Sequence, residues 1–480
     1  MHSLDHPFSP DPPWPSMSGK IQVLQANVDP SEIKEIVSNH GFAPDALPIK
    51  SLQRGQFLCP GFVDCHNHAP QWAQRGMGRG MELLDWLDKV TFAHEAKFAD
   101  PEYARRLYTS CVTGFLQQGI TTASYYGSCH GQATRVLADV CVEKGQRALV
   151  GKCNMNRNAP VWYRDASVGD SLDETRHLIQ HIHHLDPDSR LVKPVLTPRF
   201  AITCEPDLLR GLGQIASDHP DLPIQTHFNE APGEIHVTKQ LFPDFKTEAE
   251  LYQHFGLLNE RSILAHCIFL EEDEIRTLQD LGCGVAHCPI ANTTVGGGFM
   301  VAPIREYLRR GIKVGLGTDS GGGYSSSMLD TMKQAFIVSN ARMSTHQDPS
   351  LTLAETFFLA TLGGAQVCGL ETRIGNFAVG KDFDALEVHT NDLDQPGIMS
   401  PVEDEDSTAV IFEKFLATGD DRNIVKVSIV HLFSPTTNSG LTGFHQGLCV
   451  WTLGESVAGA SILVDGFQLQ KLFILEDVIC

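Results

Sequence analysis

Between about residue 57 and residue 318 the sequence alternates short, β-rich apolar runs with longer segments of helical period that often end in glycine. Parallel βαβ units produce this alternation. Eight apolar runs are predicted to be strands: residues 57–64, 120–126, 147–153, 191–197, 222–227, 262–267, 284–288 and 312–318. Eight strands that are each followed by a helix predict an α/β fold, a (β/α)8 TIM-like barrel, whose chemistry lies at the C-terminal ends of the strands.

The two ends of the chain do not follow this alternation. The segment 374–390 is predicted to form a strand pair around "VGKD", which favours a small β-domain built from both chain ends. We expect the barrel to span 57–375. The small β-domain would take its N-terminal part from 1–56 and its C-terminal part from 376–430, and the tail 431–480 shows no clear period.

Charge and cysteine content narrow the function classes. The chain has 37 basic and 58 acidic residues, a net charge of −21, which disfavours binding to nucleic acid or an anionic membrane. "RGMGRG" (75–80) is too short for an RNA-binding tract and predicts a loop. The thirteen cysteines never form CxxC, so a zinc ribbon is not expected.

No targeting or membrane segment is expected. The N-terminus is rich in proline and serine and lacks the apolar stretch of a secretory signal. The apolar stretch 448–464 is interrupted by polar residues and is short for a bilayer span. A cytosolic protein with reduced thiols is the interpretation that these features favour.

Polar residues end several of the predicted strands. His66 and His68, in "DCHNHAPQ", follow the first strand at i and i+2, so in an extended chain they point the same way. His227, His266 and Asp319 end the fifth, sixth and eighth strands. Each alone is more often a satisfied polar residue, but together on one rim they indicate a metal site. Such donors suit Zn²⁺ or Fe²⁺. If one coordination position of the metal is left for water, the metal activates that water as hydroxide.

Two further features lie near this rim. Glu230, in "HFNE", is either a helix-start cap or a carboxylate beside the metal-bound water, where it would shuttle protons. His287 ends a strand without an assigned partner, and we expect it to be structural or supporting. The glycine run in 315–327 lacks the lysine of a phosphate-binding loop, so its glycines are expected to let backbone bend close to the site.

Several motifs taken together resemble the amidohydrolase superfamily and, within it, the guanine deaminases: "PGFVDCHNHAPQ", "TPRF", "THFNE", "LAHC" and "GLGTDSGGGYSSSMLD". The likeness runs from about 57 to about 425 and includes "WLDKVTFAHE", "LATLGGAQ" and "GNFAVGKDFDA". The pair HAPQ and TPRF is the most specific part, because many amidohydrolases share the metal ligands.

The resemblance implies a zinc enzyme that hydrolyses guanine to xanthine and ammonia, acting on a C–N bond of a cyclic amidine in purine catabolism. It implies one zinc per subunit and a cytosolic homodimer. The implied metal ligands are His66, His68, His227 and Asp319, and the implied catalytic residues are Glu230, Asp319 and His266. The implied substrate-binding residues are His68, Gln71, Arg199, Phe200, His227, Glu230, His266 and Asp319.

The implied mechanism adds hydroxide to C2 of guanine while Asp319 takes its proton and Glu230 protonates the ring nitrogen. Arginine and glutamine can hydrogen-bond the polar edge of a purine, and Phe200 offers a ring face for stacking.

This sequence departs from the family at both ends, and the altered ends could leave the β-sandwich incomplete. Asn229 also stands where a serine is commoner. Two alternatives remain open: a zinc hydrolase of another heterocycle, such as cytosine, adenine or a triazine, and a catalytically weak protein kept for binding.

Overall fold

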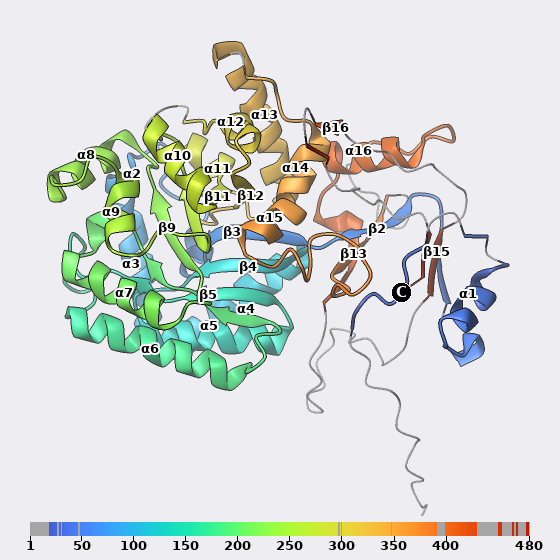
Figure 1. The fold of residues 1–480 in the computed structure, drawn as a ribbon, viewed down its shortest axis with the longest axis horizontal. Coiled ribbons are helices and arrows are strands. Elements are labelled where there is room, and N and C mark those ends of the chain that lie inside the picture. Colours follow the sequence, from blue (N-terminus) through green and yellow to red (C-terminus); the bar gives the residue numbers. More distant parts are fainter. Residues whose placement is uncertain are drawn as a thin grey trace, which may run out of the picture.

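A computed structural model describes residues 19–429, apart from 26, 27, 30, 47, 48, 296, 297, 299, 347 and 391–398, and four short strands beyond residue 449. Its centre is a barrel of parallel strands surrounded by helices (Figure 1). The barrel strands are β3 (Phe62–His68), β4 (Ile120–Tyr126), β5 (Arg147–Gly151), β7 (Val192–Pro194), β9 (Ile224–Phe228), β10 (Ser262–His266), β11 (Gly284–His287) and β12 (Lys313–Leu316). The predicted (β/α)8 barrel is confirmed.

The barrel closes at two seams between four-stranded sheets of order β3-β4-β5-β7 and β12-β11-β10-β9. At one seam Leu196 and Ile224 form a parallel bridge. At the other, the N–H of Asp319 donates to the carbonyl of His66 at 2.8 Å, and the N–H of His68 donates to the carbonyl of Ser320 at 3.0 Å. The second seam therefore brings Asp319 beside the histidines of β3.

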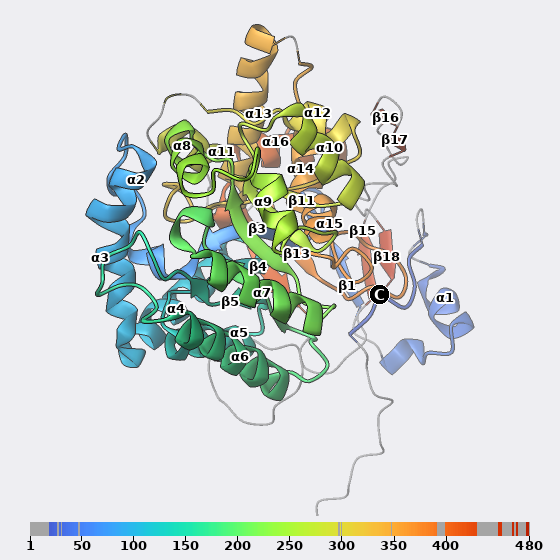
Figure 2. The same cartoon turned by 60° about the vertical axis from the view of Figure 1, so that its left-hand side comes forward.

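Amphipathic helices cover the outer side of the strands: α4 (Pro101–Gln117) packs on β4, α5 (Gly131–Lys144) on β5 and α6 (Val168–Leu185) on β7 (Figure 2). In α6 the residues Leu178, Ile179 and Ile182 are buried, the spacing of one helical face. The predicted glycine ends occur at Gly145 after α5 and at Gly282 after α10, both with left-handed backbone. The helices around the barrel are α4 (Pro101–Gln117), α5 (Gly131–Lys144), α6 (Val168–Leu185), α7 (Pro206–Asp218), α8 (Pro232–Leu241), α9 (Glu248–His254), α10 (Glu272–Leu281), α11 (Pro289–Thr294), α12 (Ile304–Arg309), α13 (Met328–His346), α14 (Leu353–Ala360) and α15 (Leu362–Val367).

The first predicted strand, 57–64, is divided in the structure. β2 (Gln56–Pro60) pairs with β13 (Ala385–His389) outside the barrel, and only β3 belongs to the barrel. Pro60 has no N–H to donate, and a side chain at Gly61 would lie 2.1 Å from the hydroxyl of Thr121. The chain therefore changes sheets at these two residues.

Strands from both chain ends share two small sheets. One has the order β14-β13-β2, with β14 at Ile424–Ser428. The other has the order β1-β15-β18, from β1 (Ile49–Leu52), β15 (Val450–Leu453) and β18 (Asp477–Ile479). The predicted division into domains stays a prediction.

The strand pair predicted within 374–390 is wrong, because only β13 forms there. Gly375 and Gly380 have left-handed backbone, with φ of 92° and 87°, which interrupts an extended strand. Helix α1 (Ile33–Asn39), which the sequence did not predict, precedes β1. No described helix is long and apolar enough to cross a membrane. Within the tail, only the strands β15, β16 (Leu463–Val464), β17 (Phe467–Gln468) and β18 are described.

Candidate metal centre and substrate pocket

Five polar side chains meet at the carboxyl ends of four barrel strands. β3 supplies His66 and His68, β9 supplies His227, β10 ends with His266, and Asp319 follows β12. None of the five is more than 9% exposed. The sequence predicted each of them at a strand end, and the structure places them on one rim.

The ligand atoms of these residues are close enough for one ion. Nε2 of His68 lies 3.0 Å from Nε2 of His227. Oδ1 of Asp319 lies 3.4 Å from Nε2 of His66 and 3.5 Å from Nε2 of His68. In the group His66, His227 and His266, the ligand atoms also lie within 4.8 Å of one another. His66 therefore takes part in two overlapping groups of candidate ligands.

The imidazoles are in the protonation state that metal binding requires. Burial, and after it the neighbouring imidazoles, holds the pKa of His68 and His227 well below its usual value. Nδ1 of His227 lies 2.6 Å from the carbonyl oxygen of Arg199, which only accepts, so Nδ1 carries the proton and Nε2 keeps its lone pair. Nε2 of His66 is buried without a hydrogen-bond partner among the described residues. A divalent cation fits this donor set.

Strained backbone accompanies the site. Asn229, His266, Cys267 and Asp319 have φ values of 45°, 73°, 48° and 42°, in the left-handed region that costs energy for residues other than glycine. Asparagine tolerates this region better than serine, which gives Asn229 a structural reason. His266 and Asp319 are candidate ligands, and Asn229 and Cys267 lie within two residues of His227 and His266, so the strain lies at the functional rim.

Glu230 faces the same space. Its Oε2 lies 3.5 Å from Nε2 of His266, whose Nδ1 lies 2.8 Å from Oδ1 of Asn292. Burial first, and then the charge of Asp319, raises the pKa of Glu230 well above its usual value. Burial also raises the pKa of Asp319 to about 6. Two buried carboxyl groups with raised pKa values can exchange protons with a reactant.

A pocket opens beside these groups and brings together most of the predicted substrate residues. Gln71, Arg199 and Phe200 line it together with His68, His227, Glu230 and Asp319. His66 and His266 are buried and are not among the residues that line it. The sequence did not predict the apolar wall of Leu83, Trp86, Leu87 and Val295. Trp86 and Leu87 begin the segment "WLDKVTFAHE", and Leu83 lies just before it. The family resemblance assigns no role to this segment.

Glu95, in the same segment, is a polar residue that sequence reasoning missed. It is fully buried and forms a bidentate ion pair with Arg199, at 2.6 and 3.2 Å. Nε2 of Gln71 donates to Oε1 of Glu95 at 2.7 Å. Glu95 therefore contacts both Arg199 and Gln71.

The glycines after β12 lie as close to the site as predicted. A side chain at Gly322 would meet the Asp319 carboxylate at 2.4 Å, and one at Gly317 would lie 2.9 Å from Cβ of His66. Arg79, from "RGMGRG", donates to the carbonyls of Gly321 and Gly322.

His287 is fully buried at the end of β11, and burial lowers its pKa to about 3.

The chain is similar to known proteins over most of its length. The model of the Amidohydrolase family matches residues 57–431. A probable guanine deaminase of Schizosaccharomyces pombe is 41% identical over 412 residues, which cover 85% of this chain and 77% of that protein. The guanine deaminase of Rattus norvegicus is 39% identical over 416 residues, which cover 86% and 89%.

A solved structure agrees with this likeness. The crystal structure of guanine deaminase from C. acetobutylicum with guanine bound in its active site is 31% identical, with a TM-score of 0.76. The match covers 86% of this chain and 92% of that one. The chain therefore belongs to the amidohydrolase family, and within that family to the guanine deaminases.

Proposed function

We propose that this chain hydrolyses guanine to xanthine and ammonia. The observation that carries the proposal is the opening of a buried His/Asp cluster onto the pocket that holds Arg199, Gln71 and Phe200. Relatives named as guanine deaminases, and a structural neighbour with bound guanine, support guanine as the substrate.

We propose one zinc ion per chain, held by His66, His68, His227 and Asp319. Three neutral imidazoles and a carboxylate form a ligand set that zinc accepts, and the buried lone pair of His66 supports it. When bound, zinc supplies Lewis acidity that lowers the pKa of water towards about 7.

Asp319 and Glu230 would carry the protons of the reaction. Asp319 lies among the candidate ligands, with its Oδ1 3.4 Å from Nε2 of His66, where its carboxylate can take a proton from the attacking water. Glu230, whose pKa is raised, holds a proton that it can give to the ring nitrogen of guanine. The new bond joins the water oxygen to C2, and the bond from C2 to the exocyclic nitrogen breaks. That nitrogen takes the proton held by Asp319 and leaves as ammonia, while the hydroxyl proton at C2 returns to Glu230 as the carbonyl of xanthine forms.

His266 would orient the water or the substrate. The contact of its Nδ1 with Asn292 fixes the ring, and its Nε2 faces Glu230. In the pocket, Arg199 and Gln71 would hydrogen-bond the polar edge of guanine, and Phe200 would stack on its ring.

A substrate panel tests the proposal. The purified chain, loaded with zinc, is given guanine, adenine, cytosine and a triazine, and ammonia release is measured. We expect turnover of guanine alone. Turnover of another member of the panel, or binding of zinc with no turnover at all, would contradict the proposed function.

We also propose a cytosolic location and a homodimer. The eleven described cysteines are buried and form no disulfides, as reduced thiols in the cytosol would be. Sedimentation of the purified chain tests the dimer, since a monomer at micromolar concentration would contradict it.

A further inference from the structure

Glu95 joins the two residues that we propose to recognise the polar edge of guanine. It ends helix α3 (Phe92–Glu95), and its side chain is inaccessible to solvent. Oε1 accepts a hydrogen bond from Nε2 of Gln71 at 2.7 Å, and Oε2 accepts one from Nη1 of Arg199 at 2.6 Å. Neither Gln71 nor Arg199 can turn in the pocket without losing a buried contact to this carboxylate.

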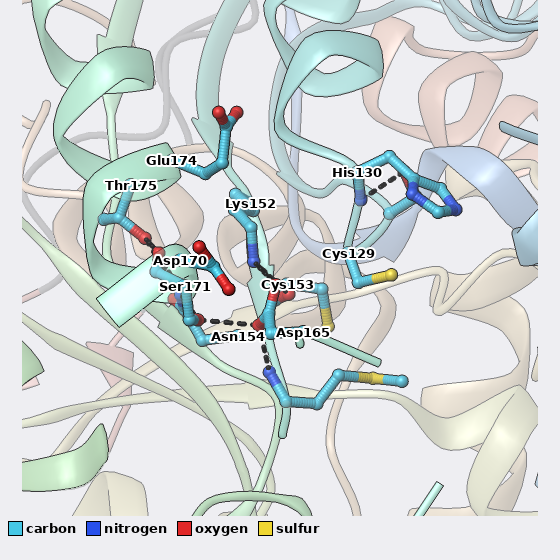
Figure 3. Close-up of polar contacts among 12 residues, drawn as sticks. Cys129, His130, Lys152, Cys153, Asn154, Asp165, Asp170, Ser171, Glu174 and Thr175 are labelled. Atoms are coloured by element: carbon cyan, nitrogen blue, oxygen red, sulfur yellow. Dashed lines mark hydrogen bonds and ion pairs between the residues drawn. The ribbon is translucent and has the colours of Figure 1, made fainter. Parts of the chain in front are cut away.

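The loop after strand β6 (Cys153–Asn154) supports Glu95 from the other side. The hydroxyl of Tyr163 donates to Oε2 of Glu95 at 2.6 Å. Two residues further on, Asp165 accepts from Nζ of Lys152 at 2.7 Å and from the hydroxyl of Ser171 at 2.6 Å (Figure 3). The buried Lys152–Asp165 pair anchors the loop, so Tyr163 holds the carboxylate in place.

This arrangement fixes which end of the Gln71 amide faces the pocket. A carboxylate that is paired with a guanidinium is ionised and only accepts hydrogen bonds. Gln71 must therefore turn its NH₂ group towards Glu95, which leaves its Oε1 for the pocket. That Oε1 is buried and has no hydrogen-bond partner among the described residues.

We infer that Glu95 is a positioning residue that sets the hydrogen-bond polarity of the pocket, with Gln71 as an acceptor and Arg199 as a donor. The inference rests on the proposed function. Guanine carries an acceptor, O6, beside a donor, N1–H, which this polarity complements. 2,6-Diaminopurine keeps the reactive 2-amino group, but it has a 6-amino group in place of O6 and an N1 without hydrogen. Its 6-amino donor would face the donor Arg199, and its N1 acceptor would face the acceptor Gln71.

The test compares kcat/KM for guanine with kcat/KM for 2,6-diaminopurine. In Glu95→Gln the new side-chain amide can donate a hydrogen bond. The amide of Gln71 can then flip, so that its oxygen faces residue 95 and its NH₂ group faces the pocket. We expect the preference for guanine to fall by about 10-fold or more, through a higher KM for guanine, because an unpaired buried polar group underlies such discrimination. Zinc content should stay unchanged.

Glu355→Gln is the matched control. It removes another bidentate pair, between Glu355 and Arg305 at 2.6 and 2.9 Å, from a place outside the pocket. This variant should lose stability and keep the wild-type preference. If the wild-type chain deaminates guanine but Glu95→Gln keeps the wild-type preference, the inference is overturned and the proposed function stands.

Two further variants keep the inference testable if Glu95→Gln does not fold. Glu95→Asp keeps an acceptor-only group and should keep most of the preference. Gln71→Leu removes the acceptor and should lose it. Wild-type preference in Gln71→Leu would overturn the inference, and a wild-type chain that leaves guanine unchanged would overturn both this inference and the proposed function.

Discussion

The Nε2 atoms of His68 and His227 lie 3.0 Å apart, although 159 positions separate the two residues in the chain. The order of the sheets puts their strands, β3 and β9, on opposite sides of the barrel. The two imidazoles can therefore meet only when the barrel is closed. Metal bound between them would report on the fold as well as on the site.

Loss of one central imidazole should remove the metal. His66→Ala takes away the nitrogen that both candidate ligand groups share. We expect metal affinity to fall by more than the roughly 10- to 100-fold that loss of an outer partner costs. His287→Ala is the control, since it also removes a fully buried imidazole at a strand end. Elemental analysis should find metal in the control variant and none in His66→Ala, and equal content in both would contradict the assignment.

Glu230→Gln should lose rate while keeping metal and fold. The amide has the shape of the acid but cannot transfer its proton, so kcat should fall by about 10²- to 10⁴-fold. Stopped assays of ammonia release measure the loss. A variant that retains more than about a tenth of the wild-type kcat would be inconsistent with proton transfer by Glu230.

Stability should depend on pH through Glu234. Burial raises the pKa of this carboxyl to about 8. Between its ordinary value and pH 8 the folded chain holds a proton that the unfolded chain has released, so the free energy of unfolding falls as pH rises through that window.

Glu234→Gln removes this titration and keeps an acceptor for the N–H of Glu230, which lies 3.1 Å from the native carboxylate. Urea unfolding at pH 6 and at pH 8 should show a smaller loss of stability in the variant than in the wild type. The exposed Glu250→Gln should behave like the wild type. If the free energy of unfolding changes equally between pH 6 and pH 8 in all three proteins, Glu234 does not have this role.

Asp382 should stabilise the junction between the barrel and the small sheets. It is buried and accepts from Nη2 of Arg147 at 2.8 Å, from Nη2 of Arg373 at 2.9 Å and from Nζ of Lys20 at 3.1 Å. In Asp382→Asn the buried Arg147 loses its closest counter-charge, so the free energy of unfolding should fall by about 3 kcal/mol.

Metal content should not change in this variant, because the pair lies outside the set of candidate ligands. The exposed Asp188→Asn, which removes a weak pair with Arg190 at 3.5 Å, should cost nothing measurable. Chemical unfolding measures the free energy of unfolding of both variants. Equal values in Asp382→Asn and Asp188→Asn would show that Asp382 does not stabilise this junction.

The barrel and its rim were predictable because both follow from local signals. A strand with His227 or His266 at or next to its last residue carries that residue at the C-terminal rim whatever its neighbours are. The distances from Asp319 to His66 and His68 were not predictable, since the closing seam between β3 and the segment after β12 sets them.

Glu95 could not have been found in this way. It lies on a short helix between the first two barrel strands, and its partner Arg199 is 104 positions away. Nothing in its own segment distinguishes it from an exposed glutamate. Similarly, the exchange of sheets at Pro60 and Gly61 depends on contacts with β13, which lies more than 300 residues further along the chain.

The most direct test of the central claim is a zinc titration of metal-free protein, with guanine-dependent ammonia release as the readout. We predict that activity rises linearly with added zinc and stops rising at one ion per chain. Full activity without zinc, or no turnover of guanine once one zinc is bound, would contradict it.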